Sequence, residues 1–316
     1  MKAFNTANGF SGFYRKYIKP YWYIYLMLLP AIVSMLIFNY APMPGVLLAF
    51  KKYSARKGIW GSAWVGLKNF RILFMYPDFW AALKNTIMLS MGRLLIEFPC
   101  AILMALLLNE VRNNRARKIM QTVFTFPHFL SWVIVAGILK NLLRQDGLVN
   151  ALLVQLQIVD EPVNIIANAS GFRPLMYITN IWKEVGWSAI IYMAAISGVD
   201  EQMYEAALID GAGRFKQTIF ITIPCIAGTI AVMFIMQVGG LLNAGFDQIF
   251  NMRNAIVREA ANILDTYIYD MTFLSAPDYS FSAAVGLFKA VIGLALLLTA
   301  DRFAYKISGQ SIYRID

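Results

Sequence analysis

The sequence predicts an all-α membrane protein with six spanning helices. Hydrophobic residues make up 59% of the 316 positions and charged residues only 15%, whereas average soluble domains hold about 45–50% and about 25%. A soluble fold of this length could not bury so much apolar surface, so an exterior that faces lipid is expected. A span needs about 20 mostly apolar residues. Six stretches meet this requirement: 21–38, 86–108, 119–139, 175–198, 222–242 and 281–300.

The predicted domain organisation is a tail at 1–20 followed by one membrane domain over 21–316. The tail carries Lys and Arg but no acidic residue, and the apolar run after it lacks the small-residue cleavage pattern of a signal peptide. This run is therefore interpreted as a retained first span. The sequence Ala-Pro-Met-Pro-Gly at 41–45 is expected to break its helix, because two prolines remove backbone donors.

The net charge of +10 is interpreted as Lys and Arg near the membrane ends, where they contact anionic lipid, rather than as a nucleic-acid site. Lys and Arg are almost equally divided between the two predicted sides, so the positive-inside rule leaves the orientation open. Much of this balance comes from the basic and aromatic segment 51–85. We expect that segment to form short amphipathic helices at the membrane surface.

Catalysis by this chain is not expected. The chain has no GxxxxGK[ST] phosphate-binding pattern. Its two cysteines and single histidine give no metal-ligand spacing, so no metal site is predicted. His128 sits beside Pro127 in an apolar run, where a hydrogen-bonded packing role is the better interpretation.

The segment 199–224 connects the fourth and fifth predicted spans. It is predicted to form a short helix over 201–209, which stops at Asp210-Gly211, a strong turn signal. The fifth span then opens around Pro224, since proline is tolerated in a first helical turn. Such a loop presents a small, mostly apolar helix with acidic groups to the aqueous side of the membrane.

This loop resembles the EAA loop of bacterial ABC-importer permeases. The resemblance is carried by Glu205-Ala206-Ala207, by Gly211 six residues after Glu205, and by Ile221, Ile223 and Pro224, with Ile223 at a position that is usually Leu. It implies that the loop faces the cytoplasm and docks on an ATPase. The residues to which it assigns ATPase coupling are Glu205, Ala206, Ala207, Asp210, Gly211 and Pro224.

Further stretches, at 40–45, 57–61, 64–70, 107–112 and 126–129, resemble the LplB-type branch of MalF-like sugar permeases. The resemblance covers nearly the whole chain and implies the MetI-like permease fold, multi-pass in the bacterial cytoplasmic membrane with a cytoplasmic N-terminus. It also implies a second, MalG-like permease, two copies of a cytoplasmic ABC ATPase that binds ATP and Mg, and an extracytoplasmic solute-binding lipoprotein. No cofactor is expected in this chain itself.

Ionisable residues within spans are costly and mark candidate functional sites. Arg93 and Glu97 stand four residues apart on the second span, so they share a helix face and are expected to form an ion pair. Lys289 on the sixth span has no partner in the sequence pattern and receives no role.

The candidate substrate path combines polar residues of two spans. On the fourth, Asn180, Lys183, Glu184 and Trp187 fall at i, i+3, i+4 and i+7 and predict one polar and aromatic stripe. Such a stripe suits a sugar, and a polar clamp to the partner permease is the alternative. On the fifth, the candidates are Gln237 and Asn243, which are six apart and are not expected to share a face.

The resemblance therefore predicts the permease of a binding-protein-dependent importer that carries an oligosaccharide. Arg93 and Lys183 raise the further hypothesis of an acidic cargo, such as a chain of uronic acids, although Glu97 and Glu184 could cancel their charge. The same importer with a non-sugar cargo such as peptide is one alternative. A stand-alone secondary transporter is another, and it would need neither ATP nor Glu205.

Overall fold

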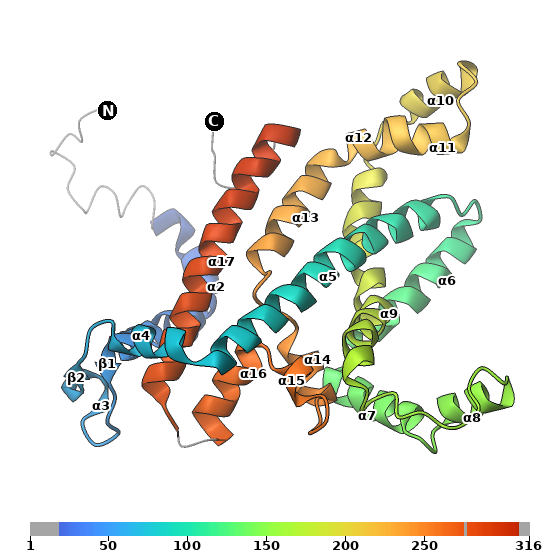
Figure 1. The fold of residues 1–316 in the computed structure, drawn as a ribbon. Helices are drawn as coiled ribbons and strands as arrows, with labels where there is room; N and C mark the ends of the chain where they lie inside the picture. The colour runs from blue at the N-terminus through green and yellow to red at the C-terminus, as the bar shows by residue number, and fades with distance from the viewer. Residues whose placement is uncertain (1–18, 275–276, 310–316) are drawn as a thin grey trace, which may run out of the picture.

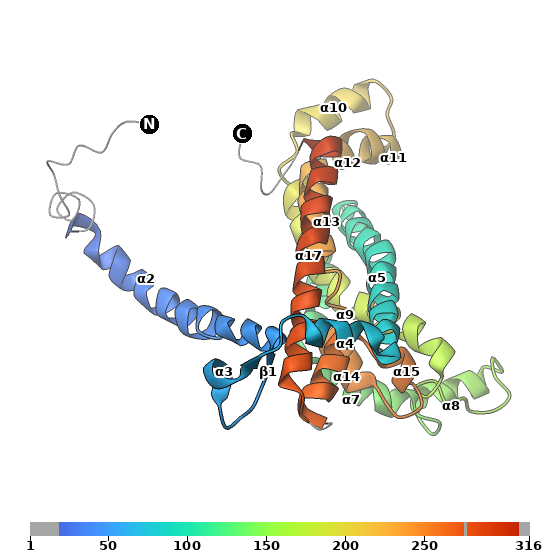
Figure 2. The same cartoon turned by 60° about the vertical axis from the view of Figure 1, so that its left-hand side comes forward.

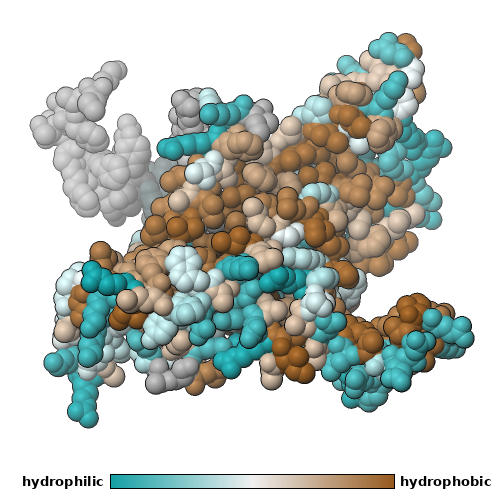
Figure 3. Space-filling view, viewed as in Figure 1, coloured by the Kyte–Doolittle hydropathy of each residue, from teal (hydrophilic) through white to brown (hydrophobic). Residues whose placement is uncertain are grey.

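The protein is a bundle of long helices that are joined by short helices at both ends (Figure 1). The computed structural model describes residues 19–274 and 277–309. Nearly all of the tail predicted at 1–20 lies outside these described residues. In the space-filling view, hydrophobic side chains cover the middle of the molecule and hydrophilic ones gather at its ends (Figure 3), as expected for a chain that crosses a membrane.

Three helical segments of the described chain are long and apolar enough to span a membrane, namely Lys19–Phe50, Pro77–Asn109 and Tyr279–Lys306. Two further pairs of helices meet the same requirement only if each bent pair counts as one span. The predicted number of six is thus not confirmed. The fourth predicted span corresponds to α9 (Ala169–Ile196), which has Lys183 and Glu184 near its middle and is not among these segments.

The beginning of the first segment stands apart from the rest of the molecule (Figure 2), whereas its end at Met43–Phe50 packs against the last helix of the chain. The segment consists of α2 (Trp22–Met35), the π-helical turn η3 (Leu36–Tyr40) and the 3-10 helix η4 (Met43–Phe50). The prolines and glycine at 41–45 change the type of helix there, as proline removes a backbone donor. They do not end the apolar segment, which continues to Phe50.

The next segment differs in part from the amphipathic helices that were expected over 51–85. β1 (Lys51–Lys52) pairs antiparallel with β2 (Ala63–Trp64), and α3 (Gly58–Gly61) lies between them. The helix α4 (Lys68–Met75) follows. Residues from Pro77 onward belong to the long helix α5 (Pro77–Asn109), because a proline is favoured in the first turn of a helix.

The third predicted span, 119–139, is sharply bent in the structure. α6 (Asn114–Thr125) and the 3-10 helix η5 (Phe126–Phe129) form one arm, and α7 (Trp132–Leu143) with α8 (Leu148–Gln155) forms the other, at an angle of 97°. Pro127 interrupts the backbone hydrogen bonds, and the Ser131 hydroxyl then caps the new helix by accepting from the Ile134 amide.

The region after α9 begins with α10 (Glu201–Ile209), whose bounds coincide with the predicted short helix. Asp200 caps it by accepting from the Gln202 amide at 3.0 Å. The next helix starts earlier than the predicted opening near Pro224. It runs through α11 (Arg214–Gln217), the π turn η6 (Thr218–Thr222) and α12 (Ile223–Cys225), and bends by 63° into α13 (Ala227–Gly239).

Short helices fill the stretch between α13 and the last helix, outside the six predicted spans. These are α14 (Phe246–Met252), α15 (Arg258–Ala261), α16 (Leu264–Tyr269) and the π-helical turn η7 (Asp270–Leu274). They lie at the end of the molecule opposite α10 (Figure 1). The last helix, α17 (Tyr279–Ser308), then returns along the bundle, and Asp278 caps its start.

The bundle is organised around two helix pairs, α5 with α9 and α13 with α17. Glycines permit close approach in the first pair and its surroundings, as is common between membrane helices. A side chain at Gly92 on α5 would collide with the Tyr177 ring on α9, and one at Gly186 on α9 would collide with the Phe124 backbone. These contacts hold α9 between α5 and α6.

We expect Gly186→Val to destabilise the protein, because the added side chain would press on the Phe124 carbonyl and backbone cannot move aside cheaply. Overpacking of this kind costs about 1–3 kcal/mol. Thermal unfolding of the purified protein in detergent measures the effect. Gly137→Val on α7 is the matched control, since nothing lies within 4 Å of that position, and equal melting temperatures for the two variants would contradict the prediction.

Candidate functional site

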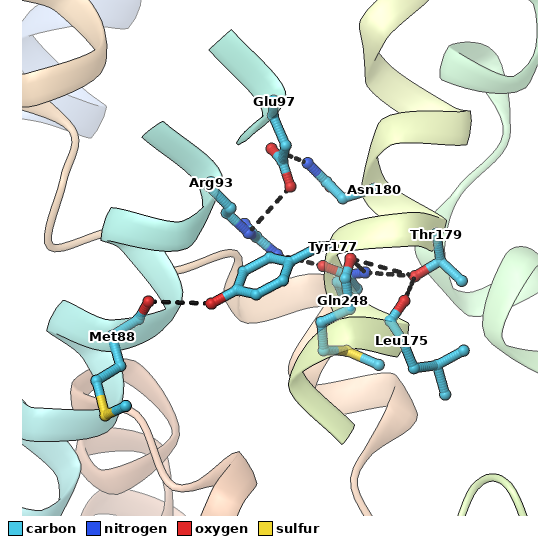
Figure 4. A network of polar contacts seen from close by, with 9 residues as sticks. Met88, Arg93, Glu97, Leu175, Tyr177, Thr179, Asn180 and Gln248 are labelled. Carbon is cyan, nitrogen blue, oxygen red and sulfur yellow. Dashed lines mark hydrogen bonds and ion pairs between the residues drawn. The ribbon is translucent and has the colours of Figure 1, made fainter. Parts of the chain in front are cut away.

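The centre of the candidate site is an ion pair within α5, together with a polar neighbour on α9 (Figure 4). Arg93 Nε lies 3.8 Å from Glu97 Oε1, and the two side chains are only 12% and 10% exposed. The other carboxylate oxygen, Glu97 Oε2, accepts a hydrogen bond of 2.6 Å from Asn180 Nδ2. Glu97 therefore links one helix turn of α5 to the middle of α9.

A glutamine from the short helix α14 completes this network. Gln248 Oε1 accepts from Arg93 Nη2, while its amide nitrogen donates to the Met176 carbonyl and to Thr179 Oγ1, both at 2.8 Å. The side chain is 1% exposed. Gly245, just before α14, lets the guanidinium pass close to the backbone, because any side chain there would collide with Arg93. The network thus joins α5, α9 and α14.

A cavity of about 250 Å³ lies between α5, α9 and α13 beside this network. Its polar lining residues are Ser90, Arg93, Glu97, Asn180, Glu184, Ser188, Gln237 and Asn243. Ser90 Oγ, Arg93 Nε and Glu97 Oε1 are buried and have no hydrogen-bond partner within the described chain. Buried polar atoms rarely stay unpaired, so the α5 wall of this cavity is suited to a polar ligand.

The structure divides the stripe that was predicted on α9. Asn180 and Glu184 line the cavity. Lys183 is buried on another side, where its ammonium donates to the His128 carbonyl at 2.9 Å and to Glu184 Oε1 at 2.8 Å. Trp187 stacks on His128 with ring centroids 4.4 Å apart. The four residues of the predicted stripe therefore have different surroundings, because two neighbours, α5 and η5, share this arc of α9.

His128 joins the second half of this stripe. Its Nδ1 lies 2.6 Å from Glu184 Oε2. The histidine thus has the hydrogen-bonded packing position that the sequence suggested, although its carboxylate partner was not foreseen.

Gln237 and Asn243 line the same cavity, whereas their spacing of six had suggested different faces. The helix α13 ends at Gly239. The chain then turns, so that the backbone N–H of Asn243 donates to the Gly240 carbonyl at 2.8 Å. Helical periodicity no longer applies after such a turn. The helix end therefore places the side chains of Gln237 and Asn243 in the lining of one cavity.

The loop over 199–224 is exposed and projects from one end of the bundle (Figure 1). No residue of α10 is buried, and Glu205 and Ala206 are both exposed. Gly211 has φ +75°, a conformation that favours glycine. Within the loop, α10 is tied to η6 by Tyr204, whose hydroxyl lies 2.9 Å from Thr222 Oγ1.

A second tie runs from Arg214 to Glu110 after α5, with 2.9 Å between Nη1 and Oε2. Pro224 lies within α12, just before the 63° bend. The loop is thus connected to the end of α5 by Arg214, and its chain continues through α12 into α13.

Several residues of the site were missed in the sequence. Ser90 shares the face of Arg93 and Glu97 at helical spacing, which is a signal that could have revealed it. Gln248 and Gly245 fall outside the six predicted spans, so no periodicity pointed to them. Only the folding of α14 against α9 explains their role.

The comparisons with known proteins agree with this arrangement. A family described as "Binding-protein-dependent transport system inner membrane component" matches residues 97–309. The chain belongs to this family. It is a family of transport permeases rather than enzymes, which confirms the resemblance seen in the EAA-like loop.

Two relatives from Bacillus subtilis (strain 168) are similar over nearly the whole chain. Protein LplB is 44% identical over 292 residues, which cover 92% of this chain and 91% of LplB. The polygalacturonan/rhamnogalacturonan transport system permease protein YteP is 47% identical over 292 residues, which cover 92% and 90%.

Two solved structures are also similar. A chain of a bacterial ABC transporter that imports the acidic polysaccharide alginate is 39% identical, with a TM-score of 0.84 over 93% of this chain and 99% of that one. A second structure of an alginate transporter, in complex with a periplasmic protein that holds an alginate pentasaccharide, gives 38% identity and the same TM-score. The fold is thus that of an ABC-importer permease.

We predict that Arg93→Met destabilises the protein more than the double variant Arg93→Met/Glu97→Met. The single change leaves a buried carboxylate without its cation, a loss that typically costs about 3–5 kcal/mol, whereas removal of both charges is often nearly neutral. Thermal unfolding of the two purified variants tests this. If the double variant were the less stable one, the charges would not be coupled as the structure indicates.

Proposed function

We propose that this chain forms half of a translocation pore that imports an oligosaccharide delivered by an extracytoplasmic binding protein. The observation that carries the proposal is the cavity beside Arg93. Its lining combines amides, hydroxyls and charged groups with buried polar atoms that lack hydrogen-bond partners. Sugar hydroxyls both donate and accept hydrogen bonds and would satisfy such atoms. The polygalacturonan/rhamnogalacturonan permease YteP and the alginate transporter, to which this chain is similar, handle the same class of cargo.

The cargo proposed for this cavity is an acidic oligosaccharide built from uronic acids. Within the described chain, Arg93 is the one Lys or Arg that lines the cavity, and its Nε has no hydrogen-bond partner. A guanidinium is well suited to a carboxylate because its donors match the two oxygens. Lys183 does not line the cavity, so Arg93 alone carries this part of the proposal.

Transport in this proposal is powered by other subunits. Two copies of a cytoplasmic ATPase would bind ATP and Mg, and a second, MalG-like permease would complete the pore. Exposed apolar side chains on α10, such as Leu208 at 69% and Ile209 at 86% exposure, are consistent with a docking helix. The ties from Tyr204 and Arg214 would transmit its rigid-body movement to the bundle.

The proposed orientation places α10 and the N-terminus on the cytoplasmic side. The start of α2 lies toward the α10 end of the molecule, and its far end leads into β1 near α4 (Figure 2). The basic segment around β1 and α4 would then lie at the outer surface of the membrane, where its exposed tryptophans Trp60 and Trp64 suit the interface.

We predict that the complete transporter, reconstituted with its binding protein in proteoliposomes, takes up tetragalacturonate faster than maltotetraose. Arg93→Gln is expected to reduce tetragalacturonate uptake by about tenfold or more, since hydrogen bonds to charged groups contribute about 1.5–3 kcal/mol. Arg258→Gln, at an exposed position outside the cavity, is the matched control. Equal uptake of the two sugars would contradict the acidic cargo, and uptake of neither would contradict the oligosaccharide.

The coupling role is tested by the double variant Glu205→Lys/Gly211→Pro. We expect normal insertion in the membrane but loss of ATPase co-purification and of uptake, because proline cannot adopt the positive φ at position 211. Glu161→Lys, exposed between α8 and α9, is the control. Wild-type uptake by the double variant, or uptake without ATP, would overturn the assignment and favour a stand-alone transporter.

A further inference from the structure

A second hollow lies on the other side of the chain segment that follows α13. We call it the side groove. It has a volume of about 470 Å³, and the residues that matter to its chemistry are Asn243, Phe246, Asp265, Tyr269, Phe273 and Lys289. A neighbouring slot of about 320 Å³ between α13 and α17 shares Asn243 and Lys289 with it. The two hollows thus meet at one amide and one ammonium.

Asn243 also lines the central cavity beside Arg93. The irregular segment 240–245 therefore stands between the cavity and the side groove, and Gly245 within it has φ +78°. Irregular backbone at membrane depth is tolerated where it is buried in protein or lines a water-filled space. Its position between two hollows fits that requirement, and it places the side groove next to the proposed cargo site.

The side groove contains an ion pair between two helices. Lys289 on α17 lies 2.5 Å from Asp265 on α16, measured from Nζ to Oδ1. The side chains are 17% and 21% exposed, so neither is sealed in the core. Lys289 therefore has a partner that the sequence pattern did not reveal. Because charges that face hydrocarbon are costly, this pair indicates that the groove faces water or a polar ligand.

Aromatic rings form the opposite wall. Tyr269 lies 5.1 Å from Phe273 and 5.9 Å from Phe246 between ring centroids. Arg253 contacts Asp270 and the Tyr269 ring of this wall. It makes two hydrogen bonds of 3.0 and 3.1 Å to Asp270, and its guanidinium lies 5.9 Å from the Tyr269 ring centroid. Phe273 at the rim is 65% exposed, so its ring is available to a ligand.

The central cavity is too small to hold an oligosaccharide of several residues by itself. At about 250 Å³, the cavity is smaller than typical ligand pockets of about 300–1,000 Å³. An oligosaccharide of several residues would extend beyond it. The adjoining groove offers what a sugar ring requires, namely an aromatic surface for its apolar face and charged or amide groups for its hydroxyls.

We propose that the side groove is a second cargo subsite, which holds a neighbouring sugar residue of the same oligosaccharide while another occupies the central cavity. Phe273 and Tyr269 contact the apolar face of the ring, and Lys289, Asp265 and Asn243 bind its polar groups. This inference rests on the proposed function. It adds that the transporter selects cargo by length as well as by charge.

The experiment compares uptake of digalacturonate and pentagalacturonate by the reconstituted transporter with its binding protein. Phe273→Ala is expected to raise the KM for the pentamer by about three- to tenfold, as expected for loss of an aromatic contact, and to leave the dimer unchanged. The neutral pair of changes Lys289→Gln/Asp265→Asn should act in the same direction. Phe303→Ala, an exposed position near the other end of α17, is the matched control.

Equal effects of Phe273→Ala on both lengths, or no effect on either, would overturn the second subsite. Size-exclusion chromatography of the solubilised complex provides a further check. If Phe273→Ala separated the two permeases, the groove would be a subunit contact and the inference would be wrong. Failure of the wild-type transporter to take up either galacturonate would instead refute the proposed cargo, so the two hypotheses are tested separately.

Discussion

The buried network of Arg93, Glu97, Asn180 and Gln248 is the interaction on which the arrangement of this permease depends. Charges inside a membrane are costly unless they are paired, and here each member of the network comes with a partner from another helix. Glu97 joins α5 to α9, and Arg93 joins α5 to α14. The network therefore holds three elements around one cavity. It also leaves buried polar atoms directed at that cavity, which links the stability of the bundle to its capacity to bind a polar cargo.

The second constraint is the geometry of broken helices. Bends of 97° and 63° divide two of the predicted spans, and α13 ends at Gly239 within the bundle. The end of α13 brings the polar side chains of Gln237 and Asn243 to one cavity. The cavity and the side groove both lie beside such an interruption. Helix ends thus create polar surface in the apolar interior, which is a recurring property of transport proteins.

The two ends of the molecule have different roles in the proposed mechanism. The α10 loop is exposed, is tied by Arg214 to Glu110 at the end of α5, and continues through α12 into α13, so a push on it would be transmitted to helices that line the cavity. At the opposite end, α14, α15 and α16 close the bundle and supply Gln248 and Asp265. Movement at one end could therefore alter the polar contacts at the other, as alternating access requires.

The sequence by itself determined the class of protein, the long apolar helices and the bounds of α10, because hydropathy and the Asp-Gly turn act locally. It also identified Arg93 and Glu97 from their spacing on one helix, and Asn180 from a polar stripe on another. Only the tertiary structure decided which polar residues meet. Lys183 turned away from the cavity toward His128, Gln237 and Asn243 came together at a helix end, and Lys289 met Asp265. These pairings depend on how helices distant in sequence pack, and periodicity within one segment carries no information about its neighbour.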